Sequence, residues 1–439
     1  MMRLRHIYAV LLGVLLAANV EAQVYIDSTE VARILGRQPA KTVAAPEISI
    51  EDGEGEDDAG FPDFQTDARL SWKENIKARL DGILQGNLVE TTQVGVMVWD
   101  LTDDSSLYSY RERMQMRPAS TMKCVTAIAA LDRLGSDYNF RTSIYCTGDS
   151  VDSTGVLKGD IYCVGGMDPM INSTDISAIA DSIRAMGVRT INGSIYADLS
   201  FKDRDRLGNG WCWDDKNPTL TPLLYGKRDE FTARLRSRLR EMEISLSGGA
   251  GERTLPGNAK LIVSRTHGIA EVMRPMMKQS DNLYAEAMFY QIGAAEGRRW
   301  SSAKQSAAYI NGLIRKVGLT PNNYNIADGS GLSLYNYVSP ELEVQLLRYA
   351  FKNKNIYDTL IETLPIAGVD GTLKSRMRGT AAAGNVRAKT GTVMGVSSLA
   401  GYLTASNGHQ LCFAIIINGG MRNGPMRNLQ NRICVALSQ

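Results

Sequence analysis

A serine followed three residues later by a lysine opens an apolar helical segment of the chain. Ser120 and Lys123 stand in RPASTMKCVTAIAAL, residues 117–131. Positions i and i+3 share one face of a helix, so we expect the Lys123 amine beside the Ser120 hydroxyl. Because serine is a weak nucleophile until a base removes its proton, this spacing predicts a nucleophile with its own base. A helix N-cap is the plainer alternative.

Two further short motifs follow, SDN at residues 280–282 and KTG at residues 389–391. Each is weak alone, and a second S-x-x-K match at Ser301 and Lys304 has no apolar helix behind it. In chain order, the three motifs fall at the start of a core helix, in a loop at the end of a helix and in a strand. This joint occurrence favours a single active site over coincidence.

Lysine, rather than histidine, is predicted to be the base. The chain has three histidines, of which His6 lies in an expected signal peptide, His267 precedes a helix and His409 adjoins a hairpin turn. An ordinary lysine pKa near 10.4 makes a poor base at neutral pH. Burial and a second cation, for which Lys389 is the candidate, lower such a pKa. We therefore expect Lys123 to be largely neutral in the resting site.

The KTG motif belongs to RAKTGTV, which reads as a strand. An edge strand with a glycine lets an extended peptide lie beside it and pair through its main chain. Lys389 and Thr390 are then placed to hold a terminal carboxylate. From the opposite wall, Ser280 would relay protons and Asn282 would offer its amide, whereas Asp281 is expected only to fix the loop.

The composition excludes some functions and leaves others open. A net charge of +2 from 49 basic and 47 acidic residues gives no electrostatic footprint for nucleic acid. None of the six cysteines lies at CxxC spacing and histidine is scarce, so neither a metal nor another cofactor is expected. Cys146 and Cys163 flank a turn-rich stretch and are candidates to face each other across a hairpin. Disulfide pairing and oligomeric state stay open.

The N-terminus predicts export. A basic MMRLRH segment precedes the apolar IYAVLLGVLLAA, and VEAQ offers small residues for cleavage before Gln23. Residues 1–22 therefore read as a signal peptide, since a membrane span needs about 20 apolar residues. An uncleaved anchor is the alternative. We expect a soluble periplasmic protein in which residues 23–70, rich in acidic side chains, form a flexible linker.

The remaining chain divides into regions by its pattern of predicted helices, strands and glycine-rich turns. Helical periodicity begins near Trp72, and strands are predicted at VGVMVWDL, LYSY, RAKTGTV, SSLAGYLTA and HQLCFAIIIN. Residues 71–139 and 265–439 are expected to form one discontinuous catalytic domain, an α/β mixed fold with an antiparallel sheet flanked by helices. Residues 140–264, with short strands, glycine-rich turns and two amphipathic helices, are expected to form a smaller inserted α+β accessory domain.

The three motifs together resemble the penicillin-binding protein and serine β-lactamase superfamily. GWCWDD at 210–215, KQSDNLYAE at 278–286 and ADGSGLS at 327–333 narrow the resemblance to type-4, low-molecular-mass D-alanyl-D-alanine carboxypeptidase/endopeptidases. It covers the chain from about Trp72 onward and implies a transpeptidase/β-lactamase-like domain. A GGMDP turn at 165–169 and a short insert depart from the family pattern.

The resemblance implies a catalytic set and a substrate-binding set. The catalytic set is Ser120, Lys123, Ser280 and Asn282. The substrate-binding set is Lys389, Thr390, Gly391 and Thr392. Ser120 is implied as the acyl-accepting nucleophile and Lys123 as its general base. The backbone N–H groups of Ser120 and Thr392 are implied as the oxyanion hole.

The implied activity is that of a serine DD-peptidase. It would hydrolyse D-Ala-D-Ala termini of peptidoglycan stem peptides, and in some cases cross-bridges, through an acyl-enzyme. β-Lactam antibiotics would be covalent inhibitors. A serine β-lactamase or esterase with the same nucleophile and a non-catalytic peptidoglycan-binding module are the alternatives.

Overall fold

The structure is a computed structural model. The residues that it describes are 64–148, 150–212, 217–295 and 300–439. The predicted signal peptide and the predicted linker up to residue 63 lie outside them. The last part of that linker is described, and there Arg79 of the following helix lies 5.8 Å above the Phe64 ring and donates a 2.7 Å hydrogen bond to Thr66.

The two ends of the described chain meet in one five-stranded antiparallel sheet of order β11-β12-β13-β1-β2. Its strands are β1 (Gln93–Asp100), β2 (Ser105–Tyr110), β11 (Arg387–Val393), β12 (Val396–Thr404) and β13 (Gln410–Asn418). All five coincide with predicted strands. The KTG strand β11 lies at the edge of the sheet, as predicted.

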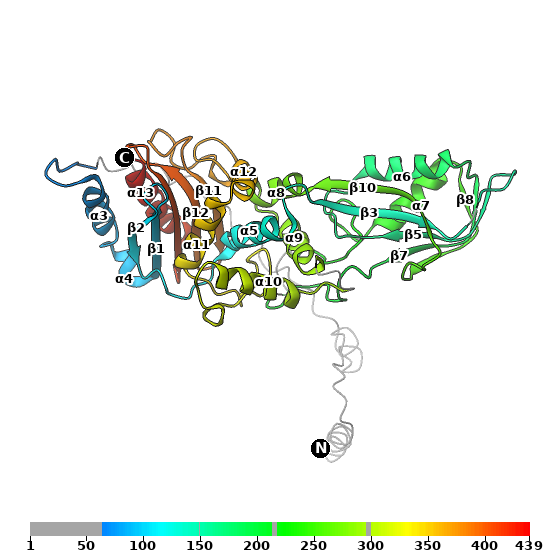
Figure 1. The fold of residues 1–439 in the computed structure, drawn as a ribbon, viewed down its shortest axis with the longest axis horizontal. Coiled ribbons are helices and arrows are strands. Elements are labelled where there is room, and N and C mark those ends of the chain that lie inside the picture. The colour runs from blue at the N-terminus through cyan, green and yellow to red at the C-terminus, as the bar shows by residue number, and fades with distance from the viewer. Residues whose placement is uncertain (1–63, 149, 213–216, 296–299) are drawn as a thin grey trace, which may run out of the picture. The chain divides into compact units, whose positions relative to one another are not determined.

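Helices cover both faces of this sheet (Figure 1). One face packs against α3 (Trp72–Ile83) and α13 (Asn423–Ser438), with the short α4 (Asn87–Thr91) nearby. The other face packs against α11 (Pro340–Lys352). Successive residues of β13 alternate between the two cores, as the two-residue period of a strand requires. The predicted mixed α/β fold with a helix-flanked antiparallel sheet is confirmed.

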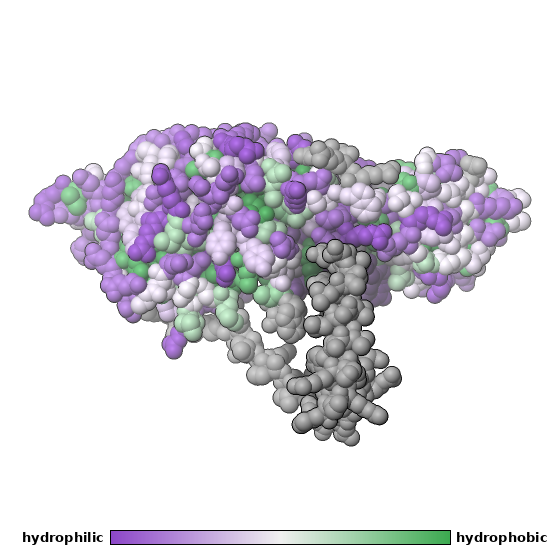
Figure 2. Space-filling view, turned by 90° about the horizontal axis from the view of Figure 1, so that it is seen from below, coloured by the Kyte–Doolittle hydropathy of each residue, from purple (hydrophilic) through white to green (hydrophobic). Residues whose placement is uncertain are grey.

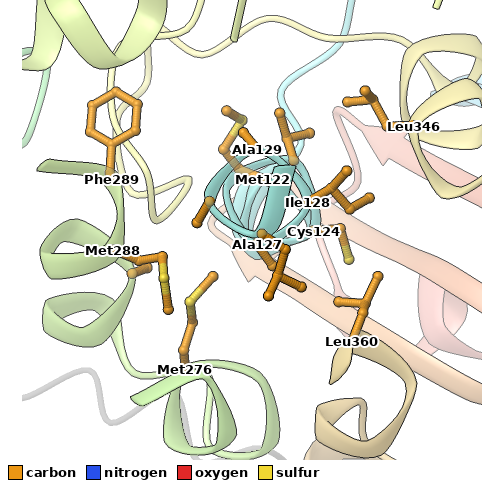
Figure 3. Close-up of a cluster of buried hydrophobic side chains, with 14 of the residues drawn as sticks. Met122, Cys124, Ala127, Ile128, Ala129, Met276, Met288, Phe289, Leu346 and Leu360 are labelled. Atoms are coloured by element: carbon orange, nitrogen blue, oxygen red, sulfur yellow. The ribbon is translucent and has the colours of Figure 1, made fainter. Parts of the chain in front are cut away.

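Helix α5 (Met122–Leu134) lies at the centre of the helical layer, and every residue from 122 to 131 is buried. Apolar side chains from neighbouring helices surround it, including Met276, Phe289 and Leu360 (Figure 3). The neighbouring helices are α8 (Ile269–Lys278), α9 (Asn282–Ala294), α10 (Ala303–Lys316), α11 and α12 (Lys354–Thr363). Within the described residues, the chain also forms three short 3₁₀ turns, η1 (Ala119–Thr121), η2 (Pro321–Asn323) and η3 (Gly371–Leu373). The first motif therefore stands at the entry to a helix that is almost entirely buried in the core.

The middle of the chain has its own apolar core between two smaller sheets and two helices. One sheet has the order β10-β3-β5-β7-β9 and the other β4-β6-β8. The elements are β3 (Asn139–Cys146), β4 (Val156–Lys158), β5 (Ile161–Val164), α6 (Ser173–Ala185), β6 (Thr190–Asn192), β7 (Ile195–Asp198), α7 (Phe231–Glu241), β8 (Ser245–Leu246), β9 (Ala250–Glu252) and β10 (Lys260–Gly268). Strand β10 runs directly into α8, so this region is joined to the helical layer without a loop.

The hairpin interpretation of Cys146 and Cys163 is wrong. Strands β3 and β5 are antiparallel neighbours, but β4 lies between them in sequence and belongs to the other sheet. Cys146 is opposite Ile161 and Cys163 is opposite Ile144. The two cysteines are therefore diagonal neighbours and do not face each other directly.

Within the part of the chain that the structure describes, no helix has the length and apolar character to cross a membrane. On the face drawn in Figure 2, hydrophilic residues dominate and the apolar areas are small and dispersed among them.

Candidate active site

The Lys123 amine contacts three groups that come from three parts of the chain. Its Nζ lies 2.9 Å from Ser120 Oγ, 2.7 Å from Asn282 Oδ1 and 2.8 Å from the Ser330 carbonyl oxygen. A neutral amine can donate two N–H bonds to the two carbonyl acceptors, which leaves its lone pair directed at the serine hydroxyl. The arrangement therefore suits an amine that takes the proton of Ser120.

Ser120 occupies the 3₁₀ turn η1, one residue ahead of Thr121, which caps α5. It is therefore not the N-cap of the α-helix, and the plainer alternative for this residue is not supported. Ala119 before it has a φ of 48°, a left-handed conformation that is uncommon for a residue with a side chain. The turn is held by the Pro118 carbonyl, which accepts hydrogen bonds from Thr121 Oγ1 at 2.9 Å and Ser398 Oγ at 2.5 Å.

The second lysine lies across the SDN motif from the first. Lys389 Nζ is 2.9 Å from Ser280 Oγ and 2.7 Å from the Thr390 carbonyl oxygen, and its side chain is fully buried. Ser280 has a φ of 60° in the connection between α8 and α9. The motif thus contacts Lys123 through Asn282 and Lys389 through Ser280. The structure brings all three motifs together.

Strand β11 offers open backbone groups next to this cluster. Its first half is covered, because the Ala388 N–H donates to the Pro365 carbonyl at 3.0 Å, on the side away from β12. The backbone alternates along a strand, so the N–H groups of Thr390 and Thr392 point to that same outer side. Among the described residues, no further strand pairs with β11 on that side of the sheet. An extended peptide can therefore add to this half of β11.

Gly391 allows β11 to approach the turn that carries Ser120. A side chain at this position would collide with Ser398 Oγ and would place its Cβ 2.8 Å from the Ser120 backbone nitrogen. Only a residue without a Cβ permits this approach. The Ser120 backbone consequently lies against the strand whose Thr392 N–H faces outward.

Burial lowers the pKa of both lysines. It lowers the pKa of Lys123 to about 8, and the negative charges of Asp328 and Glu286 oppose the shift. The pKa of Lys389 lies well below its ordinary value, first through burial and then through the positive charge of Lys123. At pH 7, only about one Lys123 in ten is then neutral. The expectation of a largely neutral Lys123 is therefore wrong at that pH, and burial rather than Lys389 is its main perturber.

Asp281 fixes the loop, as expected. Its carboxylate accepts hydrogen bonds from the backbone N–H groups of Leu283 at 3.0 Å and Tyr284 at 3.4 Å, which caps α9. It also forms a 2.5 Å ion pair with Lys227 from the middle region. The cap sets where α9 begins and so where Asn282 points.

The two remaining histidines contact other carboxylates. His267 Nδ1 lies 2.7 Å from Asp168 Oδ2, and His409 Nδ1 lies 2.9 Å from Asp100 Oδ2. Within the described residues, neither histidine forms a hydrogen bond with a residue of the three motifs. They are placed as the bystanders that the sequence predicts.

One group of side chains has the spacing of a cation site. Asp100, Asp103 and His409 present ligand atoms within 4.8 Å of one another. Lys73 Nζ lies 2.7 Å from Asp103 and 3.3 Å from Asp100, so an ammonium already supplies positive charge there. Structural ion pairing accounts for this cluster.

Sequence reasoning missed several residues that shape the site. Thr372 Oγ1 of η3 lies 2.7 Å from Thr390 Oγ1 and extends the polar wall beside β11. The carbonyl of Ser330 is a contact of Lys123, and Glu286 binds the backbone around it. A backbone carbonyl and a threonine in a turn carry no sequence signal of their own. The only pointer to Ser330 is that it lies within ADGSGLS, one of the segments that resemble the family.

Trp211 of the GWCWDD segment contacts the ADGSGLS segment, whereas residues 213–215 of GWCWDD lie outside the described residues. Asp328 accepts hydrogen bonds from Trp211 Nε1 at 2.8 Å, from the Gly331 N–H at 2.8 Å and from the Ser333 N–H at 2.6 Å. Ser333 Oγ donates to the Asn209 carbonyl at 2.7 Å. The segment around Asn209 and Trp211, within the middle region, is thereby attached to the loop that contacts Lys123.

Known proteins resemble this chain in sequence and in fold. The model of the D-Ala-D-Ala carboxypeptidase 3 (S13) family matches residues 76–223 and 227–439. A D-alanyl-D-alanine carboxypeptidase of Actinomadura sp. (strain R39) is 29% identical, over 85% of this chain and 85% of that relative. A carboxypeptidase of Mycolicibacterium smegmatis is 30% identical, over 75% of this chain and 78% of that relative.

The crystal structure of penicillin-binding protein 4 from Haemophilus influenzae has a TM-score of 0.74 at 23% identity, over 82% of this chain and 99% of that one. That protein has also been solved in complex with a β-lactam, with a TM-score of 0.68. The fold is that of a penicillin-binding protein. The chain belongs to the D-Ala-D-Ala carboxypeptidase 3 (S13) family, which confirms the resemblance drawn from the motifs.

Proposed function

We propose that Ser120 is the acyl-accepting nucleophile of a serine DD-peptidase that releases the terminal D-Ala from D-Ala-D-Ala ends of peptidoglycan. The single observation that carries the proposal is the position of the Lys123 amine, 2.9 Å from Ser120 Oγ and held by two carbonyl oxygens. Family membership supplies the substrate class. The geometry of these contacts supports the proposed roles of the residues.

The reaction follows from the contacts. Lys123 takes the hydroxyl proton while Ser120 Oγ attacks the penultimate D-Ala carbonyl, and the backbone N–H groups of Ser120 and Thr392 stabilise the oxyanion. The C–N bond then breaks, and the Lys123 ammonium returns its proton to the leaving amine, directly or through Ser280. Water next attacks the acyl carbonyl while Lys123 takes its proton. The ester bond to Ser120 Oγ then breaks, and the Lys123 ammonium returns the proton to Ser120 Oγ.

Substrate recognition is proposed at the open half of β11. An extended peptide pairs with the outward N–H of Thr390, and its terminal carboxylate meets Lys389 and the Thr390 hydroxyl. A β-lactam presents an amide carbonyl and a carboxylate at similar separation, so it acylates the same serine. Cleavage of cross-bridges is the same chemistry when the departing amine belongs to a second stem peptide.

The setting of the enzyme follows from the sequence. We place the protein outside the cytoplasm, with residues 1–22 as a cleaved signal peptide. Residues 71–139 and 265–439 are proposed as the catalytic domain, and 140–264 as the accessory domain. Strands β3 and β10 pair with each other, with Asn139 opposite Gly268, so the chain enters and leaves the middle region at neighbouring points. This pairing supports an insertion at that place.

Digestion of purified peptidoglycan tests the proposal. The intact protein should release D-Ala, and lost cross-links are counted separately to measure endopeptidase action. Ser120→Ala should abolish both products while the protein stays folded. Fast turnover of penicillin without release of D-Ala would favour a β-lactamase, and unchanged digestion by Ser120→Ala would contradict the assigned nucleophile.

A further inference from the structure

A buried carboxyl group lies one helical turn beyond the SDN motif. Glu286 follows Asn282 by four positions on α9, so both side chains lie on the same face of that helix. The Glu286 side chain is 1% exposed. Burying a carboxyl group is costly unless it is hydrogen-bonded, so its partners indicate why it is there.

The partners of Glu286 are backbone groups of the loop that holds Lys123. Its Oε1 accepts hydrogen bonds from the Ser330 N–H at 2.8 Å and the Gly329 N–H at 3.1 Å. On the opposite side, the Ser330 carbonyl accepts from Lys123 Nζ at 2.8 Å, and the Gly329 carbonyl accepts from Thr126 Oγ1 at 2.7 Å. The loop backbone is clamped between α9 and α5.

Two of the three contacts of Lys123 therefore depend on one face of α9. Asn282 supplies one contact directly, and Glu286 orients the backbone that supplies the other. Gly329 permits this packing, because a Cβ there would collide with Phe289 and would lie 2.9 Å from the Ala285 carbonyl oxygen. We propose that Glu286 is a positioning residue: it orients the Ser330 carbonyl so that the Lys123 amine is held beside Ser120. This proposal rests on the proposed function.

The charge of Glu286 acts on the same amine. Burial raises the pKa of Glu286 to about 8, with the charge of Asp328 as the next cause, and the pKa of Lys123 is also about 8. A negative Glu286 favours the ammonium form of Lys123 and so raises the pKa of that amine. The other titratable groups that face this pair are Asp281, Asp328, Lys389, Cys124 and Tyr290.

Glu286→Gln separates this role from simple packing. The second-order rate of Ser120 acylation by a penicillin is measured between pH 6 and 10. The Gly329 N–H also lies 3.3 Å from Oε2, so both carboxylate oxygens face the loop, whereas the amide places an N–H donor at one of the two positions. We therefore expect the plateau rate to fall about tenfold or more. Because the charge is removed, we also expect the midpoint of the pH profile to move to lower pH. A purely structural role would lower the plateau without moving the midpoint.

Two further variants make the test decisive. Glu286→Asp keeps the charge but shortens the reach, so it should lose rate while its midpoint stays near the wild-type value. Glu343→Gln is the matched control, since Glu343 is equally buried and burial also raises its pKa to about 8, but it has no bond to the 329–331 backbone. It should leave the midpoint in place.

The outcomes separate the two proposals. If the wild-type protein forms no penicillin adduct at Ser120, the proposed function itself fails. If the wild type is acylated and folded Glu286→Gln keeps both the rate and the midpoint, only the role of Glu286 is overturned. A midpoint shift of equal size in Glu343→Gln would also overturn it.

Discussion

Lys123 and Asn282 are joined by a 2.7 Å hydrogen bond although 159 positions separate them in the sequence. The whole middle region of the chain lies between them. The bond holds because α5 and α9 pack side by side in one apolar core, with the polar ends of both helices turned to the same place. The active site is thus assembled by the helix packing and completed by an edge strand.

Replacing the proposed base should remove most of the activity. Lys123→Met keeps the apolar length of the side chain but cannot take the Ser120 proton. General base catalysis is typically worth about 10²- to 10⁴-fold, so the acylation rate by penicillin should fall by that order. Lys304→Met, in the other S-x-x-K match, is the control and should retain the wild-type rate. A Lys123→Met protein with near-normal acylation would show that another group is the base.

Acylation should depend on pH through Lys123. Its pKa of about 8 means that the reactive neutral amine increases as pH rises. The rate constant should climb roughly tenfold per pH unit well below that value and level off above it. Quenched time courses of acylation, recorded across pH 6 to 10, measure the midpoint of this pH profile. A profile with no group titrating below about pH 9, near the ordinary lysine value, would contradict the effect of burial.

Lys389 should read the terminal carboxylate of the substrate. Two peptides that differ only in a free or an amidated C-terminus measure this discrimination as a ratio of kcat/KM. Hydrogen bonds to charged groups contribute about 1.5–3 kcal/mol, so Lys389→Ala should reduce that ratio by about 10- to 100-fold. Release of D-Ala is the readout. An unchanged ratio would place carboxylate recognition elsewhere.

Gly391 should tolerate no side chain. In Gly391→Ala the new Cβ would lie 2.7 Å from the Pro118 carbonyl oxygen and 2.8 Å from the Ser120 nitrogen, so β11 must move away from η1. We expect at least a tenfold loss of acylation because the oxyanion donors separate. Gly312→Ala is the control, since nothing lies within 4 Å of its Cβ position. Equal rates in the two variants would show that β11 does not form the oxyanion site.

Much of the fold is predictable from the sequence because its signals are local. Short runs rich in apolar and β-branched residues, bounded by turn residues, mark strands of the antiparallel sheet, and Trp72, Ile76 and Leu80 mark α3 at helical spacing. The convergence of the three motifs follows from their residue types. The parallel pairing of β5 with β7 and of β4 with β6 is not predictable in this way, because short strands carry no local sign of their partners.

The site is less predictable where a contact is made by a backbone group or where a pKa depends on burial. The Ser330 carbonyl contacts Lys123, but a carbonyl looks the same at every position of a sequence. Burial and the charge of Lys389 were both expected to lower the pKa of Lys123. Burial is the larger cause, and its extent depends on the tertiary packing of α5. The role of Glu286 likewise appears only once α9 and the loop at residues 329–331 are placed together.

The most direct measurement is the identity of the residue that a penicillin labels. The intact protein is incubated with the β-lactam, digested, and the modified peptide is sequenced by mass spectrometry. We predict one added β-lactam mass on Ser120, and none on folded Ser120→Ala. A label on any other residue of the wild-type protein, or an unlabelled Ser120 under these conditions, would contradict the account.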